Sequence, residues 1–267
     1  MAAGGRATPC KSGGGAAACR RGWRPRSSST RKENVSMSES AFKPVLESPL
    51  RHLDLQEAAE ARRADGRVWG NEAPNLGYAV LRGDGAETGF FELTARVTGL
   101  EPPRRPKALS QGEGGALLWL SPDEWLLISR RQRLAAWLPA LERGYAEQRL
   151  FAQALDVSGG FTAIYLCGEP HLAVLRHLGG YDFEALRPGQ GVCTLLGKAA
   201  VQVLRLDGDG VFVVCRRSFA DYVWLLLRRA SRPYGFAVCE LPEDDAGHPL
   251  WGGLARPAPA AVLTESS

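Results

Sequence analysis

The sequence predicts an α+β fold in which two strand-and-helix units form mixed or antiparallel sheets with helices on one face. Three observations lead to this prediction. Two short apolar segments are followed by a helical apolar stripe, and a second strand and helix follow further along the chain. The composition is also ordinary for a globular protein: of 267 residues, 45% are apolar and 23% charged. Collagen-like, coiled-coil and largely disordered chains are therefore excluded.

The first elements are a helix and two strands. Residues 54–65 are rich in Ala, Glu and Arg and predict a short helix that ends before Gly66. Apolar and β-branched residues predict strands over 78–82 and 90–97, with Gly83-Asp84-Gly85 between them.

A proline-rich linker and a clearer unit come next. Pro102, Pro103 and Pro106 mark the linker and suggest an internal boundary near residues 100–115. Residues 116–120 and 125–129 then predict two strands joined by a turn that contains Pro122. Apolar residues at three- and four-residue spacing predict a helix packed on these strands: Leu134, Trp137, Leu138, Leu141 and Tyr145.

The second unit repeats this order. Residues 161–167 predict a strand, and Pro170 opens a helix whose buried face holds Leu172, Leu175 and Leu178. Strands over 201–206 and 211–215 flank the turn sequence Asp207-Gly208-Asp209-Gly210. Ser218 and Asp221 predict a capping box for a last helix. Its apolar face comprises Phe219, Tyr222, Val223, Leu226 and Leu227.

Both ends of the chain differ in composition from the middle. Residues 1–36 hold eight basic groups and one acid, and they lack the apolar core of a secretory signal. Because Met37 stands where the composition changes, we interpret residues 1–36 as a disordered or spurious extension rather than a targeting peptide. Residues 37–240 form the predicted folded domain, and residues 241–267, rich in Pro, Ala and Gly, are expected to be a disordered tail.

The distribution of charge and of cysteines restricts the class of binding partner and the cellular compartment that the sequence predicts. Outside residues 1–36 the chain carries 25 of its 33 basic and 28 of its 29 acidic residues. The folded part is therefore mildly acidic, which disfavours a nucleic-acid partner. The longest apolar run has six residues, Tyr222–Leu227, far below the roughly 20 that cross a membrane. No Cys-x-x-Cys pair occurs, and the apolar flanks of Cys167, Cys193 and Cys215 predict buried, reduced thiols in a cytoplasmic protein.

We assign no catalytic, cofactor-binding or metal-binding residue from the sequence. Asp156 and Ser158 have no nearby His, so a structural turn is favoured over catalysis. Arg216-Arg217 beside Ser218 could hold an anion at a helix start, but exposed arginines that end a strand are the preferred interpretation. The four histidines show no metal-ligand spacing: His52, His171, His177 and His248.

Four stretches, in this order, resemble the gamma subunit of heterotetrameric sarcosine oxidase. They are Ala41–Leu50, Trp119–Leu127, Asp156–Gly160 and Arg217–Trp224. The resemblance implies a complex with alpha, beta and delta subunits that demethylates sarcosine to glycine, with hydrogen peroxide and methylene-tetrahydrofolate as the other products. It implies a fold similar to the folate-binding region of aminomethyltransferases. FAD, FMN, NAD and tetrahydrofolate are expected in the partner subunits and none in this chain.

The sequence departs from the aminomethyltransferase pattern at two places. An Asp-bearing Gly-Gly segment is replaced by Thr194–Ala200, and a polar Arg-Thr-Gly-Tyr-Thr-Gly-Glu loop is replaced by Leu206–Gly210. The resemblance therefore implies a subunit without its own active site, which acts in assembly. Trp125 and Trp224 could serve the core or a subunit interface, and the core is favoured. Two alternatives stay open: the gamma subunit of N-methylglutamate dehydrogenase, and a free-standing folate-binding, aminomethyltransferase-like protein.

Overall fold

A computed structural model describes residues 47–60, 66–206, 210–241 and 248–250. The expectations for residues 1–36 and for Asp207-Gly208-Asp209 lie outside the described residues, as do those for most of 241–267. His248 and Leu250, inside the segment expected to be disordered, are described and buried. Residues 100–115, where the sequence suggested a boundary, run from the end of one helix into the five-stranded sheet.

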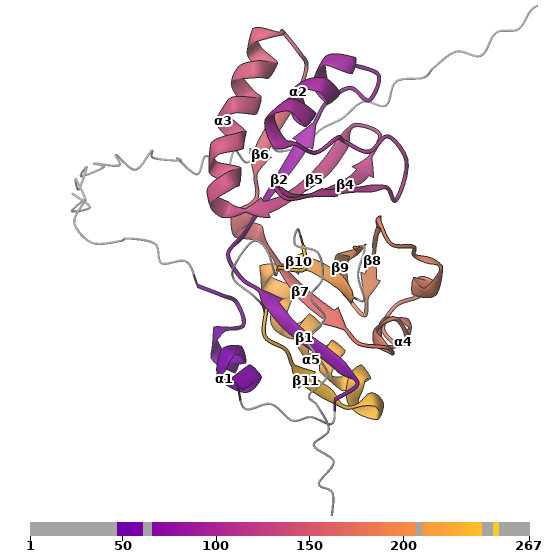
Figure 1. The fold of residues 1–267 in the computed structure, drawn as a ribbon. Coiled ribbons are helices and arrows are strands. Elements are labelled where there is room, and N and C mark those ends of the chain that lie inside the picture. Colours follow the sequence, from indigo (N-terminus) through magenta and orange to yellow (C-terminus); the bar gives the residue numbers. More distant parts are fainter. Residues whose placement is uncertain (1–46, 61–65, 207–209, 242–247, 251–267) are drawn as a thin grey trace, which may run out of the picture. The chain divides into compact units, whose positions relative to one another are not determined.

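The structure confirms an α+β fold with two sheets and helices packed on them (Figure 1). The five-stranded sheet has the order β3 (Leu109–Gly112), β4 (Gly115–Ser121), β5 (Glu124–Arg130), β2 (Leu76–Arg82) and β6 (Gln153–Asp156). The six-stranded sheet has the order β11 (Phe236–Val238), β1 (Val68–Ala73), β7 (Phe161–Cys167), β10 (Gly210–Arg216), β9 (Ala199–Arg205) and β8 (Gln190–Leu196). Neighbouring strands are antiparallel apart from β1 and β11, which are parallel.

Five α-helices accompany the sheets in the part of the chain that is described. They are α1 (Leu55–Glu60), α2 (Thr88–Thr98), α3 (Arg131–Glu147), α4 (His171–Arg176) and α5 (Ala220–Ser231). None of the described helices is long and apolar enough to cross a membrane.

The two units share one chain topology. The first runs β2-α2-β3-β4-β5-α3-β6, and the second runs β7-α4-β8-β9-β10-α5-β11. Their sheet orders correspond strand by strand, with one difference: β1 lies between β7 and β11, whereas β2 and β6 pair directly. The predicted pair of strand-and-helix units is therefore present as a structural repeat with one inserted strand.

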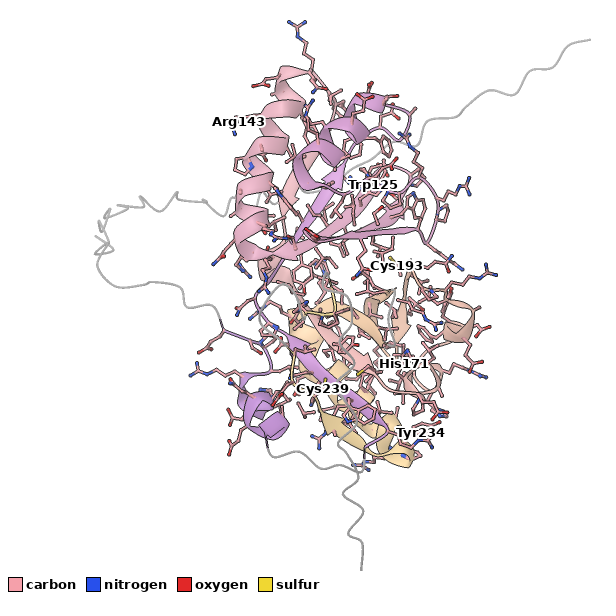
Figure 2. The ribbon with its side chains drawn as sticks, in the orientation of Figure 1. Trp125, Arg143, His171, Cys193, Tyr234 and Cys239 are labelled. Carbon is pink, nitrogen blue, oxygen red and sulfur yellow. The ribbon has the colours of Figure 1, made fainter. Side chains whose placement is uncertain are left out.

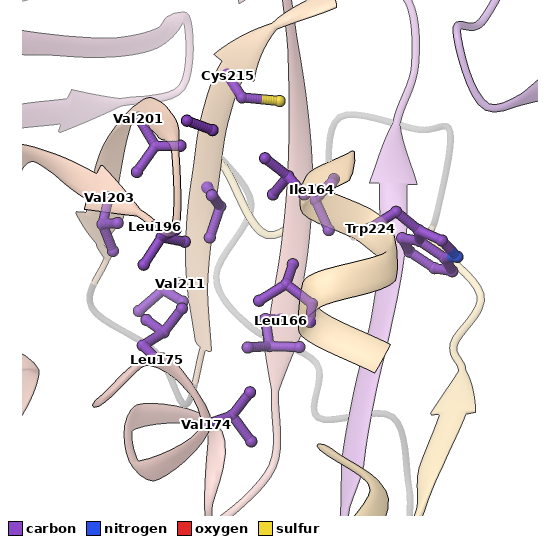
Figure 3. Packing of buried hydrophobic residues seen from close by; sticks show 14 of the residues in the cluster. Ile164, Leu166, Val174, Leu175, Leu196, Val201, Val203, Val211, Cys215 and Trp224 are labelled. Atoms are coloured by element: carbon purple, nitrogen blue, oxygen red, sulfur yellow. The ribbon is translucent and has the colours of Figure 1, made fainter. Parts of the chain in front are cut away.

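Alternating side chains separate three hydrophobic clusters. Along β10, Val211, Val213 and Cys215 face the cluster shared with α4 and α5, which Figure 3 shows. Phe212 and Val214 point the other way, into a cluster that also contains residues of the five-stranded sheet. A third cluster lies between the five-stranded sheet and helices α2 and α3. Each sheet therefore has one face toward helices and one toward the other sheet, as period-two alternation requires.

The predicted strand over residues 90–97 is wrong, because this segment is helix α2. Phe90, Phe91, Leu93 and Thr94 are buried, a pattern that fits one face of a helix. The β-branched Thr94, which favoured a strand, instead donates its hydroxyl to the Phe90 carbonyl at 2.7 Å within the helix. At the end of α2, Gly99 adopts a left-handed φ of 72° that glycine tolerates without strain.

Other differences concern short elements and a cap. Strands β1, β3, β6, β8 and β11 were not predicted; most are short or contain glycine. The capping box at Ser218 is also wrong: a 3₁₀ turn over Arg217–Phe219 leads into α5, and no side chain caps that helix. The predicted strand 161–167 and the predicted hairpin strands are confirmed as β7, β9 and β10.

Candidate functional site

Asp156 and Ser158 form a hydrogen-bonded turn. The Ser158 hydroxyl donates to Asp156 Oδ1 at 2.5 Å and accepts from the Tyr78 backbone N–H at 3.0 Å. Ser158 is buried. The pair lies in the connection between β6 and β7 and bonds it to β2, so the turn expected from the sequence is present.

The histidines have separate local partners. His52 Nε2 lies 3.2 Å from Asp221 Oδ1, His171 Nδ1 lies 2.6 Å from the Gly168 carbonyl oxygen, and His177 Nε2 lies 3.3 Å from the Tyr234 hydroxyl. His248 Nδ1 accepts from the Leu250 backbone N–H at 3.2 Å. Across the described ranges, no three His, Cys, Asp or Glu side chains are grouped so as to hold a metal ion.

The arginine pair is engaged within the chain. The Arg216 guanidinium lies over the Phe161 ring, 4.4 Å from its centroid, a cation–π contact. Arg217 donates to the Glu47 carbonyl oxygen.

Cysteine and tryptophan positions test two further predictions. Cys167 and Cys215 are buried as predicted, but Cys193 is exposed. Cys193 lies on β8, the edge strand of its sheet. Successive side chains of a strand point to opposite faces, so apolar neighbours in the sequence do not show that Cys193 itself is buried.

Trp125 and Trp224 are each 1% exposed, which confirms the core interpretation (Trp125 is labelled in Figure 2). The Trp125 indole N–H donates to the Pro103 carbonyl at 2.8 Å.

A large groove opens at one end of the five-stranded sheet, with a volume of about 1160 Å³. The β2–α2 loop, the β4–β5 turn and the α3–β6 connection meet there. A Cβ atom on Gly85 would lie 2.5 Å from the Pro122 carbonyl oxygen, so only glycine lets the first two loops approach this closely. We call it the aromatic groove; its aromatic and basic lining residues are Phe91, Trp119, Trp125, Phe151, Arg82 and Arg104.

Two exposed apolar side chains lie at or near the aromatic groove, whereas the other large ones among the described residues, Leu195, Phe219 and Leu225, lie in the six-stranded unit. The Phe151 side chain is 97% exposed and follows α3, and Leu155 on the adjoining strand β6 is 52% exposed. β6 pairs with β2 alone in the described part of the chain, so its other edge has no partner strand there. An exposed aromatic at a groove beside an open strand edge is typical of a protein–protein contact.

The charges in the groove are held in place by their neighbours. Arg82 Nη2 lies 3.0 Å from Glu124 Oε2, and this hydrogen bond raises the pKa of Arg82. The Ser121 hydroxyl donates to Asp123 at 2.6 Å and lowers the pKa of that carboxyl. The Arg104 guanidinium stacks over Phe91, 3.5 Å from the ring centroid. Two cations thus flank aromatic surface, a composition common at protein interfaces.

Sequence reasoning missed Phe151, Leu155 and Arg104. Phe151 belongs to no apolar repeat, and exposure of a single aromatic depends on the tertiary fold. One signal was present in the sequence: Phe151 follows the predicted helix but does not continue its apolar stripe, which ends at Tyr145.

The fold and groove describe a two-sheet α+β protein whose most prominent site is an open, partly apolar surface. Comparison with known proteins identifies the family. The profile of the family described as "Sarcosine oxidase, gamma subunit family" matches residues 82–233. The sarcosine oxidase subunit gamma of Corynebacterium sp. (strain P-1) is 31% identical over 194 residues, covering 68% of this chain and 89% of that protein. The chain belongs to the sarcosine oxidase gamma subunit family.

One solved structure agrees with this assignment, and a second match is weaker. A chain of the heterotetrameric sarcosine oxidase from Corynebacterium sp. U-96, in complex with pyrrole 2-carboxylate, matches with a TM-score of 0.63 and 26% identity. The match covers 73% of this chain and 98% of that chain. The glycine cleavage system aminomethyltransferase T from Bartonella henselae matches with a TM-score of 0.49 and 17% identity over 69% of this chain and 50% of that one.

Proposed function

We propose that this chain is the gamma subunit of a heterotetrameric sarcosine oxidase and that it acts in assembly rather than catalysis. Family membership supports the first part, as does a match that covers nearly all of one chain of such a heterotetramer. The observation that supports an assembly role is Phe151, exposed beside the aromatic groove and the open edge of β6. Burial of one phenylalanine side chain contributes roughly 1.5–3 kcal/mol to an interface.

The proposed partners are the alpha, beta and delta subunits, which would hold FAD, FMN, NAD and tetrahydrofolate.

The short β8–β9 connection supports the proposal that this chain does not itself bind folate. Strand β8 ends at Leu196 and β9 begins at Ala199, so Gly197 and Lys198 alone form the turn. Gly197 has a φ of 57°, and a Cβ there would lie 2.5 Å from the Tyr222 hydroxyl oxygen. The two-residue turn does not contain the Asp-bearing segment of aminomethyltransferases.

Affinity purification of the tagged full chain from its native cell tests this function. We expect co-purifying subunits, flavin absorbance and oxygen uptake that depends on sarcosine. Oxidation of N-methylglutamate without sarcosine oxidation would indicate the dehydrogenase alternative. A colourless chain recovered alone, and able to bind tetrahydrofolate, would contradict the proposal and favour the free-standing folate-binding protein.

Two matched variants test the groove within the same experiment. Phe151→Asp places a charge on the proposed contact, and we expect recovery of partners to fall at least about tenfold because the apolar contribution is lost. Leu225→Asp is the control, since Leu225 is 50% exposed on α5 in the other unit. Equal partner recovery by the Phe151→Asp variant and the wild type would exclude the groove as the contact.

A further inference from the structure

A cluster of basic side chains adjoins the aromatic groove. Two turns carry most of it: residues 104–108, which precede β3, and residues 186–190, which end at the start of β8. These turns contain four basic residues and no acidic residue, and Arg205 on β9 is opposite Gln190 in the sheet. We call the five cations the basic patch: Arg104, Arg105, Lys107, Arg187 and Arg205.

Backbone contacts hold the two turns together. The Gly191 N–H donates to the Lys107 carbonyl at 2.8 Å, and an antiparallel β-bridge joins the same two turns. Lys107 has a left-handed φ of 67°, a conformation that is uncommon outside glycine and is concentrated at functional sites. The Arg205 guanidinium is fixed as well, because its Nη1 donates to the Leu186 carbonyl at 2.5 Å. Packing of the turns therefore brings the cations to one place.

The basic patch forms no ion pair within the described part of the chain. The Arg104 guanidinium stacks over Phe91, and the Lys107 ammonium lies 5.1 Å from the centroid of the Tyr181 ring, so both cations contact neutral aromatic faces. All members of the patch except Arg205 are exposed. Like charges gathered on a surface repel one another, and a negatively charged partner relieves that repulsion.

Charge and position indicate which kind of partner fits. Residues 37–267 carry 25 basic and 28 acidic residues, so a nucleic acid would be repelled by most of this part of the chain. Arg104 and Pro106 line the aromatic groove, as does Phe151, so the patch and the exposed aromatic border the same groove. One protein segment that carries both acidic and apolar side chains would fit both surfaces.

We propose that the basic patch binds an acidic segment of the subunit that contacts the aromatic groove. This inference rests on the proposed function and adds the chemistry of the partner, namely Asp or Glu side chains beside an apolar segment. The carboxylates accept hydrogen bonds from the cations of the patch. They also fix the orientation of the subunit, because the β2–α2 loop and the β4–β5 turn bring Asp84 and Asp123 to the same groove, where an acidic segment would be repelled.

Zero-length cross-linking of the assembled complex tests the contact. A carbodiimide joins a lysine amine to a carboxyl group as an amide, with loss of water, only where the two groups touch. The described part of the chain has two lysines, Lys107 in the patch and Lys198 in the β8–β9 turn at the other end of β8. We expect Lys107 to be joined to an Asp or Glu of a partner subunit and Lys198 to stay free. A complex without a cross-link at Lys107 would overturn the proposal.

A charge-reversal variant measures what the patch contributes. The triple variant Arg105→Glu, Lys107→Glu and Arg187→Glu leaves the groove intact, because none of these residues lines it. We expect partner recovery at about 50 mM salt to fall at least about tenfold. The variant and the wild type should agree within about threefold near 1 M salt, where charges are screened beyond about 3 Å. A triple Gln variant at the same positions, with an expected loss of about threefold to tenfold, replaces the Glu variant if that variant does not fold.

The matched control reverses three exposed arginines of the other unit, Arg228, Arg229 and Arg232. It changes the net charge equally but leaves the patch as it is, so recovery should stay within about twofold of the wild type. Wild-type recovery by a folded patch variant at low salt would overturn this inference and leave the proposed function standing. A wild-type chain that recovers no partner would contradict both.

Discussion

The two units of this protein repeat one topology but differ in their edges and interiors. In the six-stranded unit β1 pairs with both β7 and β11, and the helix-side cluster is mostly aliphatic apart from Phe183 and Trp224. In the five-stranded unit no strand is inserted, and the helix side contains Phe90, Phe91, Trp125 and Tyr145. The comparison teaches that one topology tolerates an inserted strand at the edge of the sheet and a different core composition, while inward and outward side chains still alternate along the strands.

The rim difference bears most directly on function. The unit without the inserted strand carries the aromatic groove, the exposed Phe151 and the open edge of β6. In the unit with the inserted strand, Glu72 on β1 accepts a hydrogen bond of 2.5 Å from the Thr162 hydroxyl on β7. The sheet edge of the five-stranded unit therefore presents apolar surface suited to a macromolecular partner. The inserted strand of the other unit instead carries a buried acidic residue, Glu72.

The largest expected effect comes from truncating the tryptophan at the centre of each unit. Trp125→Ala and Trp224→Ala should each lower the free energy of unfolding by about 3–5 kcal/mol, because each removes an indole that is 1% exposed and packed among apolar residues. The cluster shared by the two sheets should make both variants shift the same single transition in urea. Two separate transitions, each moved by one variant, would show that the units unfold independently.

Alkaline pH should destabilise both units by a similar mechanism. Burial raises the pKa of the Cys215 thiol, in the six-stranded unit, to about 12, and burial raises the pKa of Tyr145, in the five-stranded unit, to about 12. Their ordinary values are 9.0 and 10.0, so the unfolded chain releases these protons first as pH rises. The stabilisation is complete below about pH 9 and is lost between about pH 9 and 12.

Urea unfolding at pH 8 and pH 10.5 measures this loss. We expect these two groups to lower the free energy of unfolding by about 3 kcal/mol, about 2 kcal/mol of it from Cys215, because its titration in the unfolded chain begins at the lower pH. In a Cys215→Ala variant the decrease should be clearly smaller. An equal decrease in the variant and the wild type would show that Cys215 is not responsible.

Removal of one hydroxyl from each of two buried tyrosines gives the smallest effect. The Tyr145 hydroxyl lies 3.2 Å from Thr94 Oγ1, so Tyr145→Phe should cost about 1 kcal/mol of stability. The Tyr78 hydroxyl has no hydrogen-bond partner among the described residues, so Tyr78→Phe should leave stability unchanged or raise it slightly. Thermal unfolding of both variants distinguishes them, and a larger loss for Tyr78→Phe would reverse the comparison.

Much of the central fold could be predicted, because alternation and helical spacing are local signals. Strand β7 agrees with its predicted range, and the stripe from Leu134 to Tyr145 lies on α3. Helix α2 could not be assigned, since Thr94 and Val97 carry strand preference that tertiary packing overrides. Strands β8 and β11 are a sheet edge and a three-residue segment, for which the sequence pattern is weak.

The candidate sites were less predictable than the fold. Phe151 becomes significant only because the end of α3 leaves it exposed beside a groove. The basic patch joins cations from two turns that are far apart in sequence and that only tertiary packing brings together. No spacing in a single sequence encodes such a cluster.

Hydrogen exchange measured on the isolated full chain and on the assembled complex tests the central claim most directly. If the aromatic groove is the subunit contact, backbone amides over residues 148–156 should exchange more slowly in the complex. Amides of α5, in the other unit, serve as the internal reference. Equal exchange of residues 148–156 in the two states would contradict the account.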